Sequence, residues 1–292
     1  MNADANSKKL VYVNGHFVPE DEARISVFDR GFLYGDGVFE TMRSYEGRMF
    51  RLTEHLKRLR QSADIIELRL PHEPEQFADI CKQLLVRNGL ADAILRLSVT
   101  RGRSAGGIGT SQAGEPSVVA FIRPPRPLPD SAYSEGVSAR VVSVRRNPSS
   151  ALDARMKSMN FLNNILAKAE ADRYGAYQAI MLDHAGRIAE ASTANVFFAR
   201  DGELLTPGLD CDILPGITRA AVLEVASDMG IPYEERKINP AEISGFSECF
   251  LSSSGVELVP VTQIDDQTVG AGTPGPLYAR LHAAYRELVR KE

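Results

Sequence analysis

The sequence contains no tryptophan and only three cysteines among its 292 residues. Cys81, Cys211 and Cys249 are odd in number and far apart, so they predict neither a disulfide framework nor the ligand spacing of a metal site. We therefore expect all three cysteines to be reduced and structural, and we expect no bound metal.

Long hydrophobic runs and an excess of positive charge are also missing. No stretch approaches the roughly 18 to 20 uncharged apolar residues of a membrane span, and the N-terminal "MNADANSKKL" lacks the apolar run of a signal peptide. The net charge is -4, and no basic stripe with interleaved aromatic residues is present. We expect a cytoplasmic protein that binds small molecules and neither nucleic acid nor a membrane.

Hydrophobic residues make up 43% of the chain and charged residues 25%, which is enough for one large domain or two smaller ones. "KLVYVNGHFV" alternates like a strand pair joined by a turn at Asn14-Gly15, and apolar spacing predicts helices over 51–66 and 75–90. Strands are expected over 93–102 and 117–124. The segment 123–136 has four prolines and no periodicity, so we predict a small domain over 1–122, a linker over 123–136 and a large domain over 137–292.

The large domain begins with an expected strand over 137–147. A helix of about three turns follows from Phe161, and its expected apolar face is formed by Phe161, Leu162, Ile165, Leu166 and Ala169. Residues 177–207 resemble an antiparallel meander, and a helix is expected between Gly216 and Gly230. A strand over 248–261, broken by a small-residue turn, and a helix over 276–291 complete an α+β fold.

A lysine, Lys157, stands close to the expected start of the helix at Phe161. The positive end of a helix dipole disfavours an ammonium group, so this position predicts a lowered pKa and a nucleophilic amine. Such amines form Schiff bases with carbonyl compounds, including pyridoxal 5'-phosphate (PLP). The alternative is a solvated surface lysine, which is the commoner fate of any single lysine.

A PLP site also needs a carboxylate for the pyridine nitrogen and a pocket for the phosphate. Glu190, among the small residues of "IAEASTANVFF", is a candidate carboxylate, or simply an exposed residue of a strand. "LPGITRAA" places Gly216 and Thr218 at a helix entrance, where unpaired amides bind anions, although a capped helix without a ligand would look the same. The hydroxyls and amides of Ser252 to Gly255 could bind a second anion or form only a tight turn.

Six stretches occur in the order of one protein family: "VFDRGFLYGDGVFETMR", "EHLKRLRQSA", "MKSMNFLNNILAKAEA", "AEASTANVFF", "LPGITR" and "ECFLSSSGVELVPV". Together they resemble the class IV PLP-dependent aminotransferases, over nearly the whole chain. The resemblance implies the two-domain fold of that family, with Lys157 as the Schiff-base lysine and Glu190 on the pyridine nitrogen. It further implies that Leu214 lies against the ring, and that the phosphate is held by Arg58, the amides of Ile217 and Thr218, and Ser254.

The substrate-facing residues are most similar to those of branched-chain enzymes. Arg96 in "ILRLSVTRG" stands where those enzymes bind the distal carboxylate of 2-oxoglutarate, and "SAGGIG" (104–109) resembles their glycine-containing loop. Two residues depart from the branched-chain pattern. Thr41 replaces a glycine and is typical of aminodeoxychorismate lyases, and Phe161 replaces a tyrosine. The substrate pocket implied by the resemblance is formed by Tyr34, Phe39, Thr41, Arg43, Arg96 and Gly255.

The resemblance therefore implies transamination between a branched-chain L-amino acid (leucine, isoleucine or valine) and 2-oxoglutarate. The route would be ping-pong through an aldimine on Lys157, in a homodimer whose partner contributes loop residues. The alternatives are a D-amino-acid aminotransferase, an aminodeoxychorismate lyase, and a non-catalytic relative that binds no cofactor.

Overall fold

The computed structural model describes residues 9–292, which form two compact units. Unit 1 consists of residues 9–125 together with Met156–Asn160, and unit 2 consists of Arg126–Arg155 and Phe161–Glu292. The division between Pro125 and Arg126 falls inside the segment expected as a linker. Most of "MNADANSKKL", in which no signal peptide was expected, lies outside the described residues. Within the described chain, none of the helices has both the length and the apolar character needed to cross a membrane.

The sheet of unit 1 has the strand order β2-β1-β6-β5-β3-β4, with antiparallel pairing throughout its described residues. Its strands are β1 (Leu10–Val13), β2 (His16–Pro19), β3 (Gly37–Tyr45), β4 (Arg48–Met49), β5 (Ala93–Thr100) and β6 (Ser117–Arg123). The β1–β2 turn confirms the hairpin expected at Asn14-Gly15. Both residues have positive φ, 46° and 95°, as the favoured two-residue hairpin turn requires.

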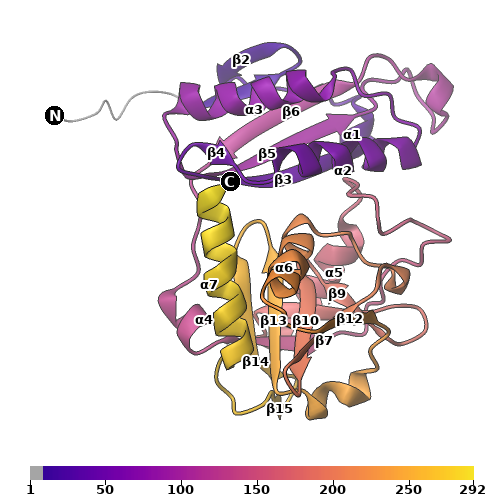
Figure 1. Ribbon diagram of the computed structural model, residues 1–292. Helices are drawn as coiled ribbons and strands as arrows, with labels where there is room; N and C mark the ends of the chain where they lie inside the picture. Colours follow the sequence, from indigo (N-terminus) through magenta and orange to yellow (C-terminus); the bar gives the residue numbers. More distant parts are fainter. Residues whose placement is uncertain (1–8) are drawn as a thin grey trace. The chain divides into compact units, whose positions relative to one another are not determined.

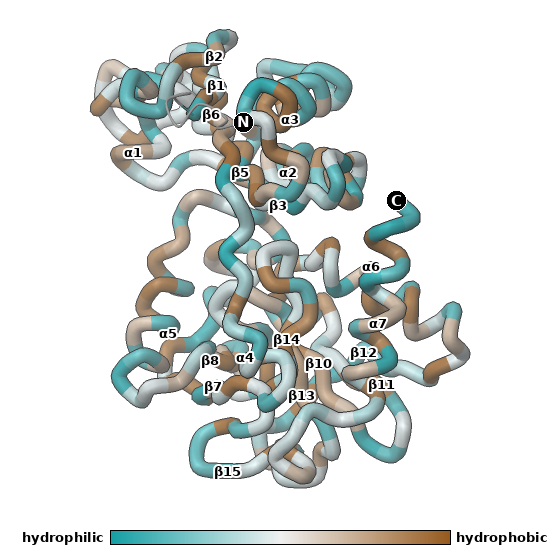
Figure 2. Tube along the Cα trace, turned by 90° about the vertical axis from the view of Figure 1, so that its left-hand side faces the viewer, coloured by the Kyte–Doolittle hydropathy of each residue, from teal (hydrophilic) through white to brown (hydrophobic). Residues whose placement is uncertain are grey.

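Two amphipathic helices, α2 (Leu52–Ile65) and α3 (Pro74–Asn88), cover one face of this sheet (Figure 2). α2 buries Leu56, Leu59 and Ala63, as its apolar spacing predicts. α3 ends at Gly89, which adopts the left-handed conformation that glycine reaches without a steric penalty. The short helices of unit 1 are α1 (Arg30–Tyr34) and the 3₁₀ helix η1 (Thr110–Gln112).

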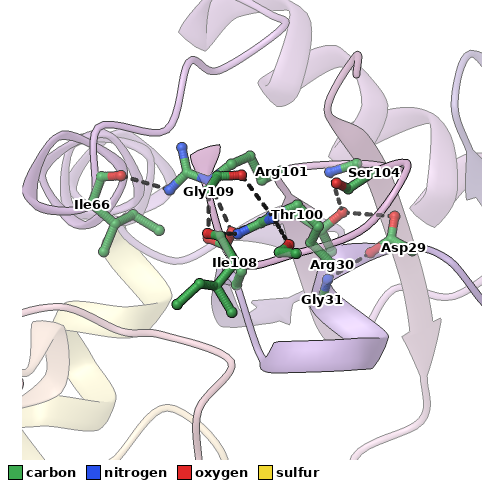
Figure 3. A network of polar contacts seen from close by, with 12 residues as sticks. Asp29, Arg30, Gly31, Ile66, Thr100, Arg101, Ser104, Ile108 and Gly109 are labelled. Carbon is green, nitrogen blue, oxygen red and sulfur yellow. Dashed lines mark hydrogen bonds and ion pairs between the residues drawn. The ribbon is translucent and has the colours of Figure 1, made fainter. Parts of the chain in front are cut away.

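A buried ionic network holds the 104–109 loop of unit 1 (Figure 3). Arg30 donates through Nε to Asp36 at 2.7 Å, and its two terminal nitrogens donate to the carbonyl oxygens of Gly107, Ile108 and Gly109 at 2.9 to 3.2 Å. Asp36 also accepts from Arg101. Burial alone would raise the pKa of Asp36, but the hydrogen bonds and charges of the two arginines lower it overall.

Unit 2 contains a mixed sheet with the order β12-β11-β10-β13-β14-β7-β8-β9, and β15 pairs with β14. Its strands are β7 (Val137–Val141), β8 (Gln178–Leu182), β9 (Ile188–Ala191), β10 (Asn195–Arg200), β11 (Glu203–Pro207), β12 (Tyr233–Arg236), β13 (Glu248–Ser253), β14 (Glu257–Ile264) and β15 (Gln267–Thr268). The four strands expected as one meander form two hairpins, β8–β9 and β10–β11, at opposite ends of this order. Because β9 also contacts β10, the sheet curls toward a half-barrel.

The helices of unit 2 are α4 (Asp130–Ser134), α5 (Leu162–Arg173), α6 (Ile217–Asp228) and α7 (Pro276–Lys291), with 3₁₀ helices η2 (Leu209–Cys211) and η3 (Pro240–Gly245). α7 lies alongside β13 and β14 (Figure 1). The core inside the curled sheet includes Val196, Phe198 and Leu251. All three cysteines are free and buried, as expected.

The face that α5 buries differs from the expected one. Leu162, Ile165 and Leu166 are each more than half exposed. The helix instead buries Asn164, Ala167 and Ala171, because small side chains allow it to lie close to β8. An apolar helix face is thereby left at the surface of unit 2.

We predict that Arg30→Met lowers the free energy of unfolding by roughly 3 kcal/mol, because four hydrogen bonds of a buried guanidinium are lost. The change should also make the 104–109 loop the first site of limited proteolysis. Urea denaturation and mapping of the cleavage sites would measure both effects. Arg123→Met is the matched control, since the Arg123–Glu20 pair is about half exposed and should contribute at most about 1 kcal/mol. Equal losses in the two variants would contradict the prediction.

Candidate active site

Lys157 is positioned by β3 and not by a helix terminus. Helix α5 begins at Leu162 with Phe161 as its N-cap, so Lys157 precedes its first turn. The Lys157 carbonyl accepts from the Phe39 amide at 2.9 Å, and the Met159 amide donates to the Gly37 carbonyl at 2.8 Å. The Lys157 amide donates to Ser62 Oγ of α2 at 3.0 Å. The segment is thus joined to the start of β3 by an isolated antiparallel bridge between Ser158 and Val38.

The ring of Phe39 has both an amine and a guanidinium close to it. Lys157 Nζ is 4.7 Å from the ring centroid, and Arg96 Cζ is 3.7 Å from it. Phe39 and Thr41 are on one face of β3 because strand side chains alternate, and Arg96 is directly opposite Thr41 on β5. Burial lowers the pKa of Arg96. Four of the expected residues therefore lie together.

Two further residues expected at the substrate, Tyr34 and Arg43, also belong to unit 1. Tyr34 ends α1 and is exposed, with the Arg30 guanidinium 5.3 Å from its ring centroid. Arg43 lies two residues beyond Thr41 on the same face of β3, and its guanidinium is 4.6 Å from the Tyr45 ring centroid. We call Phe39, Thr41 and Arg96, which share one face of the sheet, the Phe39 surface.

The opposite face of β3 carries a buried carboxylate that fixes Arg58. Glu40 is fully buried and accepts from Arg58 Nε at 2.8 Å and from Arg58 Nη2 at 2.7 Å. His55 Nδ1 lies 2.7 Å from Glu40 Oε2 and must donate, because an ionised carboxylate only accepts. Two of the five guanidinium donors of Arg58 are thereby held in one orientation.

The two titratable partners of Arg58 have shifted pKa values. Burial would raise the pKa of Glu40, but the charge and hydrogen bonds of Arg58 and the hydrogen bond of His55 lower it to about 2. Burial lowers the pKa of His55 by more than its hydrogen bond to Glu40 raises it. Near neutral pH, therefore, an ionised Glu40 holds Arg58, and a neutral His55 holds Glu40.

In unit 2, Glu190 is held by three donors. Its Oε1 forms an ion pair with Arg146 Nη2 at 2.9 Å, and its Oε2 accepts from the Leu214 amide at 3.1 Å and from Asn195 Nδ2 at 3.2 Å. Glu190 is buried at β9, and Arg146 is also largely buried. A cation and two neutral donors thus fix the carboxylate, and they join it to the segment that leads into α6.

The N-terminus of α6 is built to receive an anion. Gly216 is its N-cap, no side chain caps it, and no acidic residue lies in its first turn. A Cβ at Gly216 would lie 1.9 Å from Asn195 Oδ1, so a larger residue there would displace the Asn195 side chain. Ile217 and Thr218 are the first helical residues, and Thr218 is buried.

Ser252 is an unsatisfied polar group in the same part of unit 2. Its Oγ is buried and has no hydrogen-bond partner within the described chain. Ser252 pairs with Asn195 across β13 and β10, so both side chains are on the same face of the sheet, and Asn195 in turn contacts Gly216. A phosphate oxygen could accept from this hydroxyl. Ser254 and Gly255 follow in the turn after β13. The residues present therefore fit a phosphate-bearing cofactor.

The structure thus gathers the expected residues into two sets. Unit 1 holds Lys157, Arg58 and the Phe39 surface, and unit 2 holds Glu190, Leu214, Ile217, Thr218, Ser254 and Gly255. Sequence reasoning did not find Glu40, His55, Arg146 or Asn195, although all but Arg146 stand in the quoted "VFDRGFLYGDGVFETMR", "EHLKRLRQSA" and "AEASTANVFF". Their roles come from strand register and helix packing, which no local pattern shows.

The chain matches the family described as amino-transferase class IV over residues 37–264. It belongs to this family. A putative branched-chain-amino-acid aminotransferase of Methanocaldococcus jannaschii is 37% identical over 281 residues, which is 96% of each chain. A D-alanine aminotransferase of Bacillus licheniformis is 33% identical over 282 residues, covering 97% of this chain and 98% of the relative.

Solved structures of class IV enzymes agree with the fold. The branched-chain amino acid aminotransferase of Escherichia coli has a TM-score of 0.93 at 29% identity, covering 97% of this chain and 95% of that one. The T.th. branched-chain enzyme, complexed with N-(5'-phosphopyridoxyl)-L-glutamate, has a TM-score of 0.91 at 32% identity, covering 98% of this chain and 95% of that one. The expected fold class and family are confirmed, and the protein is a PLP-dependent aminotransferase.

We predict that Glu40→Gln destabilises the protein by roughly 3 kcal/mol at neutral pH, given 1.36 kcal/mol for each unit of pKa shift. The pKa of Glu40 is lowered from 4.5 to about 2 in the folded protein, so its contribution is complete above pH 4.5 and is lost as the pH falls toward 2. Urea denaturation at a series of pH values, down to the lowest at which the protein folds, would measure it.

The free energies of unfolding of wild type and Glu40→Gln should therefore converge as the pH falls below about 4.5. Glu20→Gln is the control, because Glu20 is half exposed beside Arg123 and should give a small, nearly constant difference. Parallel curves for wild type and Glu40→Gln would show that the Glu40 charge does not stabilise the fold.

Proposed function

We propose that this aminotransferase transfers amino groups between L-leucine, L-isoleucine or L-valine and 2-oxoglutarate. The observation that carries this proposal is the Phe39 ring with Lys157 Nζ and the Arg96 guanidinium both against it. An apolar ring beside an amine suits an amino acid with an apolar side chain. A guanidinium at the same ring suits the second carboxylate of 2-oxoglutarate.

The cofactor assignments follow the family and fit the local geometry of each unit. The family assigns cofactor roles in unit 1 to Lys157 and Arg58. In unit 2 it assigns them to Glu190, Leu214, Ile217, Thr218 and Ser254. When bound, PLP supplies a carbonyl that reacts with amines and a ring that accepts the electron pair of the broken Cα–H bond. Glu190, fixed by three donors, would accept the hydrogen bond of the pyridine nitrogen, and Arg58, fixed by Glu40, would donate to the phosphate.

Lys157 would move the proton. Its backbone is fixed at both N–H and C=O, so the side chain starts from a constant point on β3. Nζ would take the proton from the substrate Cα and pass it to C4′ of the cofactor within the same half-reaction, and the second half-reaction would move a proton in the opposite direction. The neighbouring Phe39 ring would exclude water on one side of that path. Both substrates would use the same residues in turn, which gives ping-pong kinetics.

D-alanine transamination is the second candidate function. Relatives named D-alanine aminotransferases are 31 to 34% identical over almost the whole chain. Thr41 adds a side chain opposite Arg96, where a branched substrate would need room, and Phe161 cannot donate a hydrogen bond. The 104–109 loop, in contrast, has neither an arginine nor a histidine for an α-carboxylate.

A cytoplasmic homodimer is part of the proposal. The exposed face of α5, formed by Leu162, Ile165 and Leu166, is a contiguous apolar row at helical spacing. In unit 1, Val27, Phe28 and Phe32 are each more than half exposed. Apolar side chains gathered in this way are typical of surfaces that bury one another in an oligomer. The three free cysteines suit a reducing compartment.

Half-reaction spectra would test the substrates. We predict that L-leucine converts the PLP form of the purified protein to the pyridoxamine phosphate form, whereas D-alanine does not. Addition of 2-oxoglutarate should then restore the PLP spectrum. Conversion by D-alanine alone would overturn the branched-chain proposal in favour of the second candidate, and conversion by neither amino acid would contradict both.

Two variants sharpen this experiment. Lys157→Ala should remain folded and show no conversion with either amino acid, because no amine moves the Cα proton. Arg96→Met should be converted by L-leucine but be restored far more slowly by 2-oxoglutarate, because only the dicarboxylate needs the guanidinium. Equal losses in both directions would assign Arg96 a structural role.

We predict that Ile165→Lys raises the dimer dissociation constant at least about tenfold, because a charge replaces an apolar contact in the buried interface. Sedimentation equilibrium over a range of protein concentrations would measure it. Val86→Lys is the matched control, since Val86 is an exposed apolar residue of a helix in unit 1. A wild-type monomer, or an unchanged dissociation constant in Ile165→Lys, would overturn the assignment of the α5 face.

A further inference from the structure

In the turn between β13 and β14, the residue with a left-handed backbone is a glutamate and not the nearby glycine. Ser253 and Glu257 close the hairpin, and Ser254, Gly255 and Val256 lie between them. Glu257 has a φ of 61°, in the left-handed region that favours glycine. Gly255, in contrast, has no such φ, and no atom lies within 4 Å of the position that a Cβ would take there.

The backbone conformation of this turn therefore does not explain why residue 255 is glycine or why residue 257 is glutamate. Glycine stands at 255, where the fold could accept a side chain, and glutamate stands at 257, where the fold would favour glycine. Open space over Gly255 suits the close approach of a ligand to the backbone. The left-handed conformation of Glu257 costs free energy that a buried interaction can offset, and strain of this kind clusters at functional sites.

The carboxylate of Glu257 supplies that interaction. It is buried, and its Oε2 lies 3.2 Å from His282 Nε2 and 3.1 Å from Arg286 Nε. Both partners project from α7, one turn apart on the helix. Glu257 thus joins the end of the turn to the C-terminal helix of unit 2.

Further contacts make this junction rigid. Tyr278 Oη lies 3.1 Å from His282 Nδ1 and donates to the Leu258 carbonyl at 3.4 Å. From α4, Tyr133 stacks on the His282 ring with centroids 5.9 Å apart and donates to the Val256 carbonyl at 3.3 Å. Side chains of α4 and α7 therefore hydrogen-bond to the carbonyl groups of the two residues on either side of Glu257.

Helix α7 is itself anchored to the sheet. The buried Glu248 of β13 accepts from the amides of Leu277 and Tyr278 at 2.9 and 2.7 Å, which satisfies the first turn of the helix. A Cβ at Gly275 would lie 2.0 Å from the Glu248 side chain, so the approach is as close as glycine allows. His282 and Arg286, the partners of Glu257, thus lie on a helix whose start is held against β13.

We propose that Glu257 is a positioning residue that holds the Ser254–Val256 turn in the shape that binds the cofactor phosphate. The proposal rests on the proposed function, which assigns Ser254 to that phosphate. Without the carboxylate, the turn would occupy several conformations, and the apparent dissociation constant would rise as the binding-competent fraction falls. The protein would bind the cofactor phosphate less tightly, while the stability of the fold would change little.

Glu257→Gly separates these two effects, because glycine removes the carboxylate and also relieves the left-handed strain. We expect the variant to melt at or above the wild-type temperature, and its dissociation constant for PLP to rise roughly tenfold. Binding of pyridoxal, which lacks the phosphate, should change by less than about twofold. Titrations of the cofactor-free protein with PLP and with pyridoxal would measure both constants.

Glu46→Gly is the matched control, since Glu46 is an exposed glutamate with a φ of 50° in unit 1. It should bind both compounds as the wild type does. Unchanged PLP binding in Glu257→Gly would overturn the proposal. So would a lower melting temperature with equal weakening of PLP and pyridoxal, because Glu257 would then support only the fold.

Amide hydrogen exchange of residues 253–257 gives a readout that needs no cofactor. Faster exchange in Glu257→Gly than in wild type is expected, and equal exchange would show that the carboxylate does not hold the turn. If the wild-type protein bound no PLP, the proposed function would fail on its own, and the exchange rates would still decide whether Glu257 orders the turn.

Discussion

The backbone pairing of residues 157–159 with the start of β3 is the interaction on which the unit 1 site depends. Two hydrogen bonds to Gly37 and Phe39 bring a lysine from more than thirty residues beyond β6 back to the first sheet. The same strand carries Phe39 on one face and Glu40 on the other. A single strand register therefore sets the distance from the amine to the Phe39 surface and to the carboxylate that orients Arg58.

Much of the fold follows from local signals in the sequence. Asn14-Gly15 marks a turn because both residues tolerate positive φ, and Gly89 ends α3 for the same reason. The helix at 217–228 was predicted from its entry glycine and its apolar spacing. These predictions are confirmed because each element forms its backbone hydrogen bonds with residues only a few positions away. The exposed face of α5 was not predicted, since its sequence pattern shows an apolar face but not which side of the helix meets β8.

The sequence was enough to propose the candidate site residues that carry chemistry, but not the residues that hold them in place. Lys157, Glu190 and Gly216 were identified because amines, carboxylates and glycine-entered helices have chemistry of their own. The dipole argument for Lys157 stays a prediction about its pKa, because the structure shows only that α5 begins at Leu162 and that residues 157–159 pair with β3. Glu40, His55, Arg146 and Asn195 act only through partners far away in the sequence. Their pairing depends on which strands and helices meet, and a single sequence does not contain that information.

The return of residues 156–160 to unit 1 also constrains how such a chain can be divided. The backbone passes between the two units three times: after Pro125, after Arg155 and after Asn160. A gene fragment that encoded residues 9–125 alone would lack the lysine. One that encoded residues 126–292 would carry the lysine without the strand that places it. Neither unit is therefore a contiguous cassette that recombination could transfer whole, so the amine and the strand that positions it have to be inherited together.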